Sequence, residues 1–589
     1  MSTHHAEAGY HRKTALIIVA AAILYVAGSW GVSLWDRDEA WYCQTSKQMV
    51  QSGDWVVPHF LDQPRYAKPI FIYWCQAASM TIFGANEFAA RLVSGVAMTA
   101  TLTMLGVVLS RAIGGRRAML TVLIFSSSAL VITAAKMCLT DSVLLLFITG
   151  MQLCLFRLYR AAGSRRPVGW TMDHPVPRSQ DSRSTLATAM AMWVCIAMAV
   201  LTKGPVVFAL MFGTMIALAL LDMGRQCRSL QAWRAAIAWW KHIRFLRGLL
   251  IVLVVGLPWL LAAYLRHPDF IWKMLREPGQ HFGSNQDGHW QAPGYFLVTI
   301  WLTYFPWSLL LPTALTLGWK HRGLPHVRFA LAIILGNWVF AEMMVTKLPH
   351  YILPAFTSLA FLTATALIRC VRRQHDDLDR RVFYGALGVW ACGAMMLAAL
   401  PYVGAWRLED PARGGGLLFA AVGVAYVAAV VVLFARRRLV GAATLAGGGM
   451  MLLITILYMC YLPSAAFLRL PQRVASELER LRKLDGPGDG RVIMVDYDEP
   501  SLAFYQGGTI GKAEKPYLRQ TPPEQWPRWI VISSKFFDSL PPSRQRCLQR
   551  MATLSGVNYN TGGKVVDLFI MRKSDAVAAQ TDPAAAPEQ

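Results

Sequence analysis

Long apolar runs recur along the chain between Thr14 and Leu462, separated by short polar segments. A run of ~20 apolar residues forms a helix that crosses the ~30 Å hydrocarbon layer of a membrane. No water is available there to the backbone, so each run must satisfy its own polar groups as a helix. The pattern predicts about thirteen transmembrane helices, over residues 14–35, 88–110, 118–135, 140–160, 185–202, 205–222, 247–266, 295–318, 327–345, 350–368, 382–401, 416–435 and 439–462.

Basic residues gather in alternate connections between these runs. If the N-terminus is cytoplasmic, every strongly basic short connection lies on the cytoplasmic side, as membrane proteins prefer. Examples are the connections with Arg116, Arg165, Arg234 and Arg436. The net charge of +24 therefore reflects membrane topology, and we expect no nucleic-acid partner. An odd number of spans places the C-terminal part outside the cytoplasm.

Composition supports a mainly α polytopic bundle, since 55% of residues are hydrophobic and only 16% are charged. We expect a membrane domain over 1–462, which includes outer loops 36–87 and 267–294. A soluble α/β domain should follow over 463–575, with helices at 472–482 and 542–554 and strands at 491–497, 529–533 and 565–572. The Ala/Pro-rich end, 576–589, is expected to be disordered. The ten cysteines are scattered without a CxxC pair and indicate neither a disulfide framework nor a zinc site.

Acidic residues stand where the first run leaves the membrane. Asp38 and Glu39 follow this run directly, and His59, Arg65 and Lys68 come later in the same outer loop. Such carboxylates are consistent with a solvated helix end. They are equally consistent with an acidic cluster facing a lipid-linked substrate, because charges at this depth cost little and reach headgroups.

Two lysines depart from the cytoplasmic placement of positive charge. Lys203 and Lys347 lie in very short outer connections, where a lysine either snorkels to the interface or binds a phosphate. Asp141 begins the run 140–160, as a helix N-cap or as a second acid beside Asp38. Arg276 lies in the second outer loop and is a further candidate for the carrier phosphate.

Histidines in the second outer loop make a metal site possible as an alternative. His281 and His289 are eight positions apart, a weak metal signature that ordinary loop histidines also give. Together with Asp38, Glu39 and His59 they offer ligands for a divalent ion. The sequence therefore implies no certain cofactor and leaves a divalent metal as an open alternative.

Several short motifs occur in order along nearly the whole chain. They are Asp38-Glu39 with Tyr42, Gly53-Asp54-Trp55, Arg65-Tyr66, Lys68-Pro69, Phe88-Ala89-Ala90-Arg91-Leu92, Leu139-Thr140-Asp141, Thr202-Lys203-Gly204-Pro205, Gly288-His289, Phe305-Pro306-Trp307, Lys347-Leu348-Pro349, and Glu499-Pro500-Ser501-Leu502 with Phe504-Tyr505. In these motifs the chain resembles the GT-C membrane glycosyltransferases of the protein O-mannosyltransferase superfamily. The resemblance is strongest to the branch that contains the lipid A aminoarabinose transferase.

This resemblance implies an enzyme of the bacterial inner membrane that takes a sugar from a polyprenyl-phosphate carrier. The acceptor would lie at the outer face and be a glycolipid such as lipid A, with membrane lipids as surroundings. Asp38 would be the principal catalytic carboxylate and Asp141 a second acid. Lys68, with Lys203 or Lys347, would hold the carrier phosphate. The residues expected to line the substrate cavity are Glu39, His59, Arg65, Arg91, His281, His289, His350 and Tyr351.

Three positions depart from the aminoarabinose branch, which carries Arg at the place of Trp41, Glu at that of Ala67 and Arg at that of His281. The sugar and acceptor therefore stay open. One alternative is transfer to Ser or Thr of a protein. A transporter or flippase is the alternative from another class, although the chain lacks the repeated halves common in transporters. For the enzyme, we expect attack on the anomeric carbon with inversion, and Asp38 as general base when the acceptor is a hydroxyl.

Overall fold

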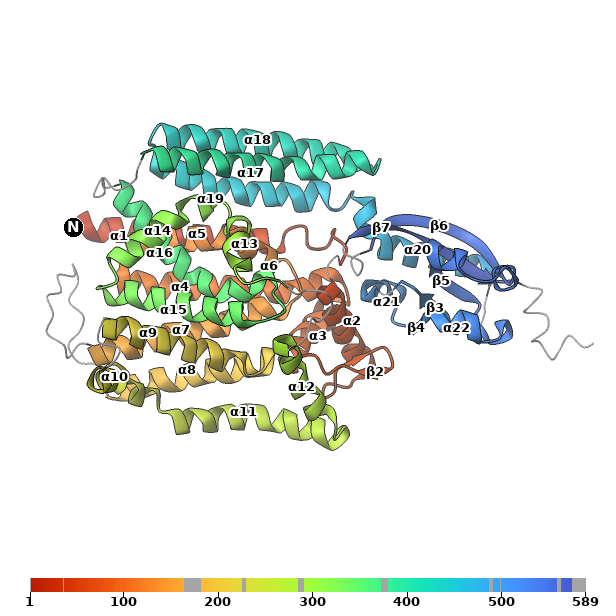
Figure 1. Ribbon diagram of the computed structural model, residues 1–589, viewed down its shortest axis with the longest axis horizontal. Helices are drawn as coiled ribbons and strands as arrows, with labels where there is room; N and C mark the ends of the chain where they lie inside the picture. The colour runs from red at the N-terminus through yellow and green to blue at the C-terminus, as the bar shows by residue number, and fades with distance from the viewer. Residues whose placement is uncertain are drawn as a thin grey trace, which may run out of the picture.

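The computed structural model describes residues 2–34, 37–163, 182–224, 229–283, 291–371, 380–486, 491–497, 499–558 and 563–574. Long helices run side by side through one part of the molecule, and a small sheet packed with helices stands at one end of it (Figure 1). The helices of the first part are α1 (Ser2–Val26), α2 (Arg37–Ser52), α3 (Phe71–Phe83), α4 (Glu87–Ile113), α5 (Gly115–Ser126), α6 (Ala129–Ala135), α7 (Thr140–Gly163), α8 (Ser182–Lys203), α9 (Val206–Met223), α10 (Leu230–Ile237), α11 (Phe245–Arg266), α12 (Phe270–Gly283), α13 (Tyr295–Thr303), α14 (Leu311–Lys320), α15 (Pro325–Met343), α16 (Phe356–Val371), α17 (Arg380–Arg407), α18 (Arg413–Ala435) and α19 (Leu439–Ile456).

The predicted helical membrane bundle is confirmed. Among the described residues, ten helices are long and apolar enough to span a membrane, or eleven if α5 and α6, bent by 68°, form one span. Two predicted spans are helical only in part. The run 14–35 leaves the helix at Val26, just before Gly28 with φ of 75°. The run 295–318 is divided between α13 and α14 around Pro306, since proline has no N–H to continue a helix.

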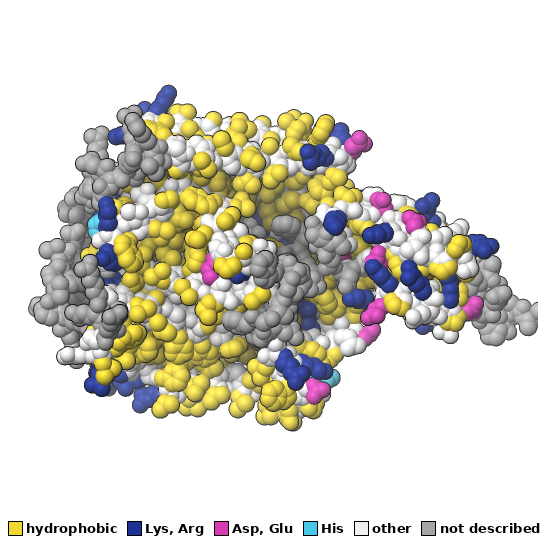
Figure 2. All heavy atoms as spheres, viewed as in Figure 1, with side chains coloured by type: hydrophobic (Ala, Val, Ile, Leu, Met, Phe, Trp, Pro, Cys, Tyr) yellow, Lys and Arg dark blue, Asp and Glu magenta, His cyan; other side chains and the backbone are white. Residues whose placement is uncertain are grey.

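The surface agrees with a lipid environment. Large apolar side chains face outward from the bundle, among them Leu246 (82% exposed), Val389 (76%) and Val298 (74%). Figure 2 shows hydrophobic side chains over the helical part, whereas charged side chains are frequent over the C-terminal part. A soluble protein would rarely leave so large an apolar surface uncovered. The chain is therefore a multi-pass membrane protein.

The C-terminal part contains a five-stranded mixed sheet of order β4-β3-β5-β7-β6. Strand β3 is parallel to β4 and β5, while β7 is antiparallel to β5 and β6. Its strands and main helices are α20 (Leu470–Asp485), β3 (Val492–Val495), α21 (Pro500–Gln506), β4 (Ile510–Ala513), α22 (Lys515–Gln520), β5 (Trp529–Ser533), α23 (Ser534–Asp538), α24 (Pro542–Gln545), β6 (Leu548–Asn558) and β7 (Lys564–Lys573).

One element of this sheet was predicted wrongly from the sequence. The segment 542–554 was expected to be helical, but only α24 is, and β6 begins at Leu548. Strand β6 pairs along its length with β7. A long strand partner thus decides the conformation of a segment whose own pattern is ambiguous.

The sheet docks beside the outer loop through polar contacts at α21. The Tyr505 hydroxyl accepts a hydrogen bond from the Leu34 N–H (2.8 Å) and donates one to Glu87 Oε1 (2.9 Å). Lys47 Nζ of α2 donates to the Phe504 carbonyl at 2.8 Å. The C-terminal part therefore contacts both ends of the segment that carries Asp38.

Candidate active site

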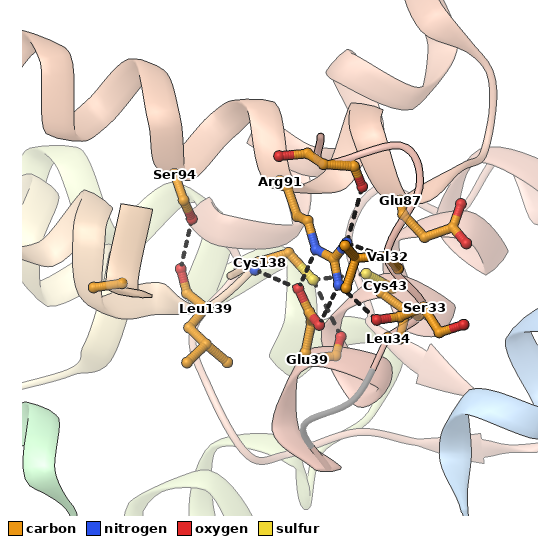
Figure 3. Close-up of polar contacts among 12 residues, drawn as sticks. Val32, Ser33, Leu34, Glu39, Cys43, Glu87, Arg91, Ser94, Cys138 and Leu139 are labelled. Carbon is orange, nitrogen blue, oxygen red and sulfur yellow. Dashed lines mark hydrogen bonds and ion pairs between the residues drawn. The ribbon is translucent and has the colours of Figure 1, made fainter. Parts of the chain in front are cut away.

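A buried ion pair sets the start of α2. Arg91 of α4 and Glu39 form two hydrogen bonds, Nε to Oε1 at 2.7 Å and Nη2 to Oε2 at 2.8 Å. The same guanidinium donates to three carbonyls of the α1–α2 connection, those of Ser29, Val32 and Ser33. Figure 3 shows Arg91 between this connection and Glu39. One cation thus links α4, the connection and α2.

This arrangement corrects two expectations. Glu39 and Arg91 were predicted to line the substrate cavity. They are instead 0% and 1% exposed and are bonded to each other. A buried charge is stable only when it is paired in this way. Neither side chain is available to a substrate, and the pair positions the neighbouring exposed Asp38.

The same carboxylate also anchors the segment before α7. Glu39 Oε1 accepts a hydrogen bond from the Cys138 N–H at 3.1 Å. Helix α7 begins two residues later at Thr140, with Asp141 in its first turn. Carboxylates are favourable in the first turn of a helix because the free N–H groups there are partly positive. Glu39 therefore connects the two chain segments that carry the acids Asp38 and Asp141.

Asp141, Lys203 and His350 form one polar cluster. Lys203 Nζ lies 2.8 Å from Asp141 Oδ1, and His350 Nε2 lies 3.7 Å from Asp141 Oδ2. All three side chains keep some exposure, 10% for Asp141 and 18% for each of the other two. The Lys203 ammonium also lies 5.5 Å from the centre of the Tyr351 ring. A polar group at this position can bind an anion or hand over a proton.

Asp38 and Lys68 lie within electrostatic range of this cluster. The charge of Lys68 acts on Asp141 and on His350. The charge of Asp38 acts on Lys203 and on His350. Five residues from separate segments therefore share one site, which we call the acid–lysine cluster: Asp38, Lys68, Asp141, Lys203 and His350.

Arg65 borders the acid–lysine cluster from the outer loop. Its Nε donates to the Tyr73 hydroxyl at 3.1 Å, and its guanidinium lies 4.6 Å from the Trp41 ring centre. Burial raises the pKa of Tyr42 beside it well above the ordinary value, so this phenol stays neutral. The rings of Trp41 and Tyr42 thus hold the Arg65 guanidinium within electrostatic range of Asp38.

Three other predicted residues have different surroundings from those of the acid–lysine cluster. His59 belongs to a separate group, with Nδ1 2.9 Å from the Val57 carbonyl and 4.0 Å from Asp54 Oδ2. Lys347 is 4% exposed, and its ammonium donates to the carbonyls of Gln291 and Met344. Arg276 is exposed on α12. The ammonium of Lys347 thus contacts backbone carbonyls, whereas that of Lys203 contacts a carboxylate.

The metal alternative gains no support from the described part of the chain. No group of three or more His, Cys, Asp or Glu side chains is arranged there to hold an ion. The side chain of His281 and all of His289 lie outside the described residues.

One buried cation within electrostatic range of Arg91 was not predicted. Lys136 is 0% exposed, donates to the Ala27 carbonyl at 2.6 Å and lies 4.1 Å from the Tyr458 ring centre. A signal for it exists in the sequence. Like Lys203, it is a basic residue at the outer end of an apolar run, where the placement of positive charge predicts none.

The family model for dolichyl-phosphate-mannose-protein mannosyltransferase matches residues 12–273. The undecaprenyl phosphate-alpha-4-amino-4-deoxy-L-arabinose arabinosyl transferase of Pseudomonas paraeruginosa is 30% identical over 396 residues, 66% of this chain and 65% of that protein. A second such transferase, from Proteus mirabilis, is 31% identical over 351 residues, 58% of this chain and 56% of that protein. The match thus spans less than two thirds of these relatives' length.

The fold has a counterpart among solved structures. The crystal structure of ArnT from Cupriavidus metallidurans bound to undecaprenyl phosphate superposes with a TM-score of 0.70. The superposition covers 98% of this chain and 99% of that one at 18% identity. The likeness therefore extends over both the helical bundle and the C-terminal sheet.

Proposed function

We propose that this chain, whose residues 12–273 match the family model for dolichyl-phosphate-mannose-protein mannosyltransferase, transfers a sugar from a polyprenyl-phosphate carrier to an envelope acceptor. The named relatives favour 4-amino-4-deoxy-L-arabinose on undecaprenyl phosphate as the donor. Lipid A is the acceptor that we propose, since it lies within reach of an enzyme at the outer face of the inner membrane.

The observation that carries this proposal is the acid–lysine cluster. Lys203 and Lys68 provide positive charge where a carrier phosphate would have to lie, and Asp38 is an exposed carboxylate beside them. When the bond between the anomeric carbon and the phosphate oxygen breaks, its electrons move to that oxygen. Fixed cations lower the barrier by stabilising this charge. Asp141 holds the Lys203 ammonium in place for this task.

The acceptor oxygen would attack from the face opposite the leaving phosphate, so the sugar inverts. If the acceptor is a hydroxyl, Asp38 takes its proton as general base. If the acceptor is a phosphate of lipid A, it is already anionic and needs no base. Asp38 then orients it or stabilises the positive charge that develops on the sugar ring.

We place the acid–lysine cluster at the outer face, with the N-terminus cytoplasmic and the C-terminal part outside. Support comes from basic residues of three separate helices. Arg117 of α5, Arg160 of α7 and Arg369 of α16 all act electrostatically on His326, at the start of α15. Asp141 and Lys203 belong to the opposite ends of their spans. Positive charge thus gathers at one end of the bundle, as at a cytoplasmic face.

The test is transfer by the full-length protein in proteoliposomes. Undecaprenyl phosphate carrying radiolabelled 4-amino-4-deoxy-L-arabinose is the donor, and lipid A or a Ser/Thr-rich peptide is the acceptor. We expect label in lipid A with inverted anomeric configuration. Label in the peptide would instead indicate protein glycosylation. Donor that crosses the bilayer without transfer would indicate a flippase and overturn the proposal.

Asp38→Asn tests the role of the carboxylate. The side chain is exposed, so the variant should fold like the parent while transfer to a hydroxyl falls by ~10²–10⁴-fold. Asp62→Asn is the matched control, since Asp62 is exposed in the same outer loop and has no place in the acid–lysine cluster. Near-normal turnover of Asp38→Asn with every acceptor would eliminate Asp38 as a catalytic residue.

A further inference from the structure

Two cysteines meet at the base of the acid–lysine cluster. Cys43 Sγ and Cys138 Sγ lie 2.7 Å apart, and both residues are 0% exposed. Figure 3 shows the two side chains next to each other beside Glu39. The Cys138 sulfur also lies 3.3 Å from the Glu39 carbonyl oxygen. Two bonds with Glu39, from the N–H and the sulfur of Cys138, therefore hold Cys138 against the start of α2.

We propose that Cys43 and Cys138 form a disulfide that joins α2 to the segment before α7. The two sulfurs already lie close to the ~2.05 Å of an S–S bond. The two cysteines are 95 positions apart in the sequence, so no local pattern predicts that they pair. In the reduced state the same pair makes a thiol–thiol hydrogen bond, which is the alternative state that the test must distinguish.

The position of the bond gives it a consequence for catalysis. Cys43 follows Asp38 by little more than one helical turn, and Cys138 precedes Asp141 by three residues. A covalent link between them fixes the spacing of the two segments that carry the acids. It acts at the same place as the Glu39–Arg91 pair, and with it forms a positioning framework beneath the acid–lysine cluster.

The chemistry requires an oxidising compartment, so this inference rests on the outer orientation in the proposed function. Disulfides persist outside the cytoplasm, including in the bacterial periplasm. Each thiol loses its proton, one S–S bond forms, and two electrons pass to a disulfide of an oxidant, which becomes two thiols. Burial raises the pKa of both thiols, so in the folded protein they are poor nucleophiles. The bond must form before α2 packs against Cys138, and burial then protects it.

The test maps the cysteines of the full-length protein, purified without reductant. Thiols are blocked with an alkylating reagent under denaturing conditions, and the digest is analysed by mass spectrometry. We expect a linked peptide pair that contains Cys43 and Cys138, with Cys460 and Cys547 alkylated as internal controls. Recovery of both Cys43 and Cys138 in alkylated form would overturn the proposal.

A second measurement asks whether the link positions the acids. The variant Cys43→Ala/Cys138→Ala should lose thermal stability and lower kcat by about 10-fold, as expected for misplaced reacting groups, with little change in the donor KM. Cys460→Ala is the control. An unchanged kcat in a folded double variant would refute the positioning role.

Orientation and activity are tested separately. Labelling of Cys547 by a membrane-impermeant maleimide in spheroplasts reports the side of the C-terminal part, independently of the disulfide. A linked pair in a protein without transfer activity would refute the proposed function and retain the disulfide. Alkylated Cys43 and Cys138 together with labelled Cys547 would refute the disulfide and retain the orientation.

Discussion

Removal of Arg91 tests how the site is built. In Arg91→Met, the Glu39 carboxylate stays buried without its cation. Removing one partner of a buried pair costs ~3–5 kcal/mol. The guanidinium also makes three hydrogen bonds to the carbonyls of Ser29, Val32 and Ser33. Those groups lose their donor as well, so we expect the upper end of this range.

Arg91→Lys separates charge from geometry. Lysine keeps the positive charge, but its ammonium has three donors, whereas the Arg91 guanidinium makes five hydrogen bonds, two to Glu39 and three to carbonyls. At least two acceptors must therefore lose a direct bond. We expect destabilisation of ~2–3 kcal/mol, from unsatisfied buried groups. Asp38 should then be held less firmly, and kcat should fall more than the donor KM changes.

The assay is thermal unfolding of the detergent-solubilised protein together with its transfer rate. Arg480→Met is the control, because this exposed arginine pairs with Glu477 on the same helix and its loss should leave Tm unchanged. The double variant Glu39→Met/Arg91→Met should be less destabilised than the sum of its single variants, because it leaves neither charge of this pair buried without the other. An Arg91→Met protein with the parental Tm would refute the reasoning.

Three further predictions follow from single contacts. Lys203→Met should lower kcat/KM for the donor by ~10²-fold, because the ammonium beside Asp141 is lost. The ammonium of Lys347 bonds only carbonyls among the described residues, so Lys347→Met should lower Tm with a smaller kinetic effect. Equal kinetic losses in the two variants would contradict this difference. Tyr505→Phe should lower the free energy of unfolding by ~1–3 kcal/mol, because buried groups lose a hydrogen-bond partner, and so should lower Tm. An unchanged Tm would show that this contact is not stabilising. Burial alone would raise the pKa of Asp54, but the N–H groups of Val56 and Val57 and the Arg266 guanidinium lower it. The Asp54 carboxylate therefore stabilises the folded protein at pH above its ordinary pKa of 3.8, and this stabilisation is lost as pH falls through the lower pKa of the folded state. The Tm of Asp54→Asn should accordingly fall less on acidification than the Tm of the parent.

Hydropathy by itself determined the kind of protein. A long apolar run has one solution in a membrane, a helix, so the bundle could be predicted without knowledge of its packing. The basic residues in alternate connections likewise predicted which connections are cytoplasmic, without knowledge of the packing. Motif order along the chain indicated the family, and isolated charges such as Asp141 and Lys203 were found because a charge near an apolar run needs a reason.

Only the tertiary structure decided which charges face each other. Glu39 and Asp38 are neighbours in the sequence, yet helical geometry turns one inward to Arg91 and leaves the other exposed. Lys203 and Lys347 look alike as lone lysines in outer connections, but one meets a carboxylate and the other meets carbonyls. The contact of Cys43 with Cys138 likewise depends on the packing of α2 against a segment 95 positions away. Local pattern sets the conformation of a segment and its depth in the membrane, whereas the partner of a buried polar group is set by long-range packing, which no single segment encodes.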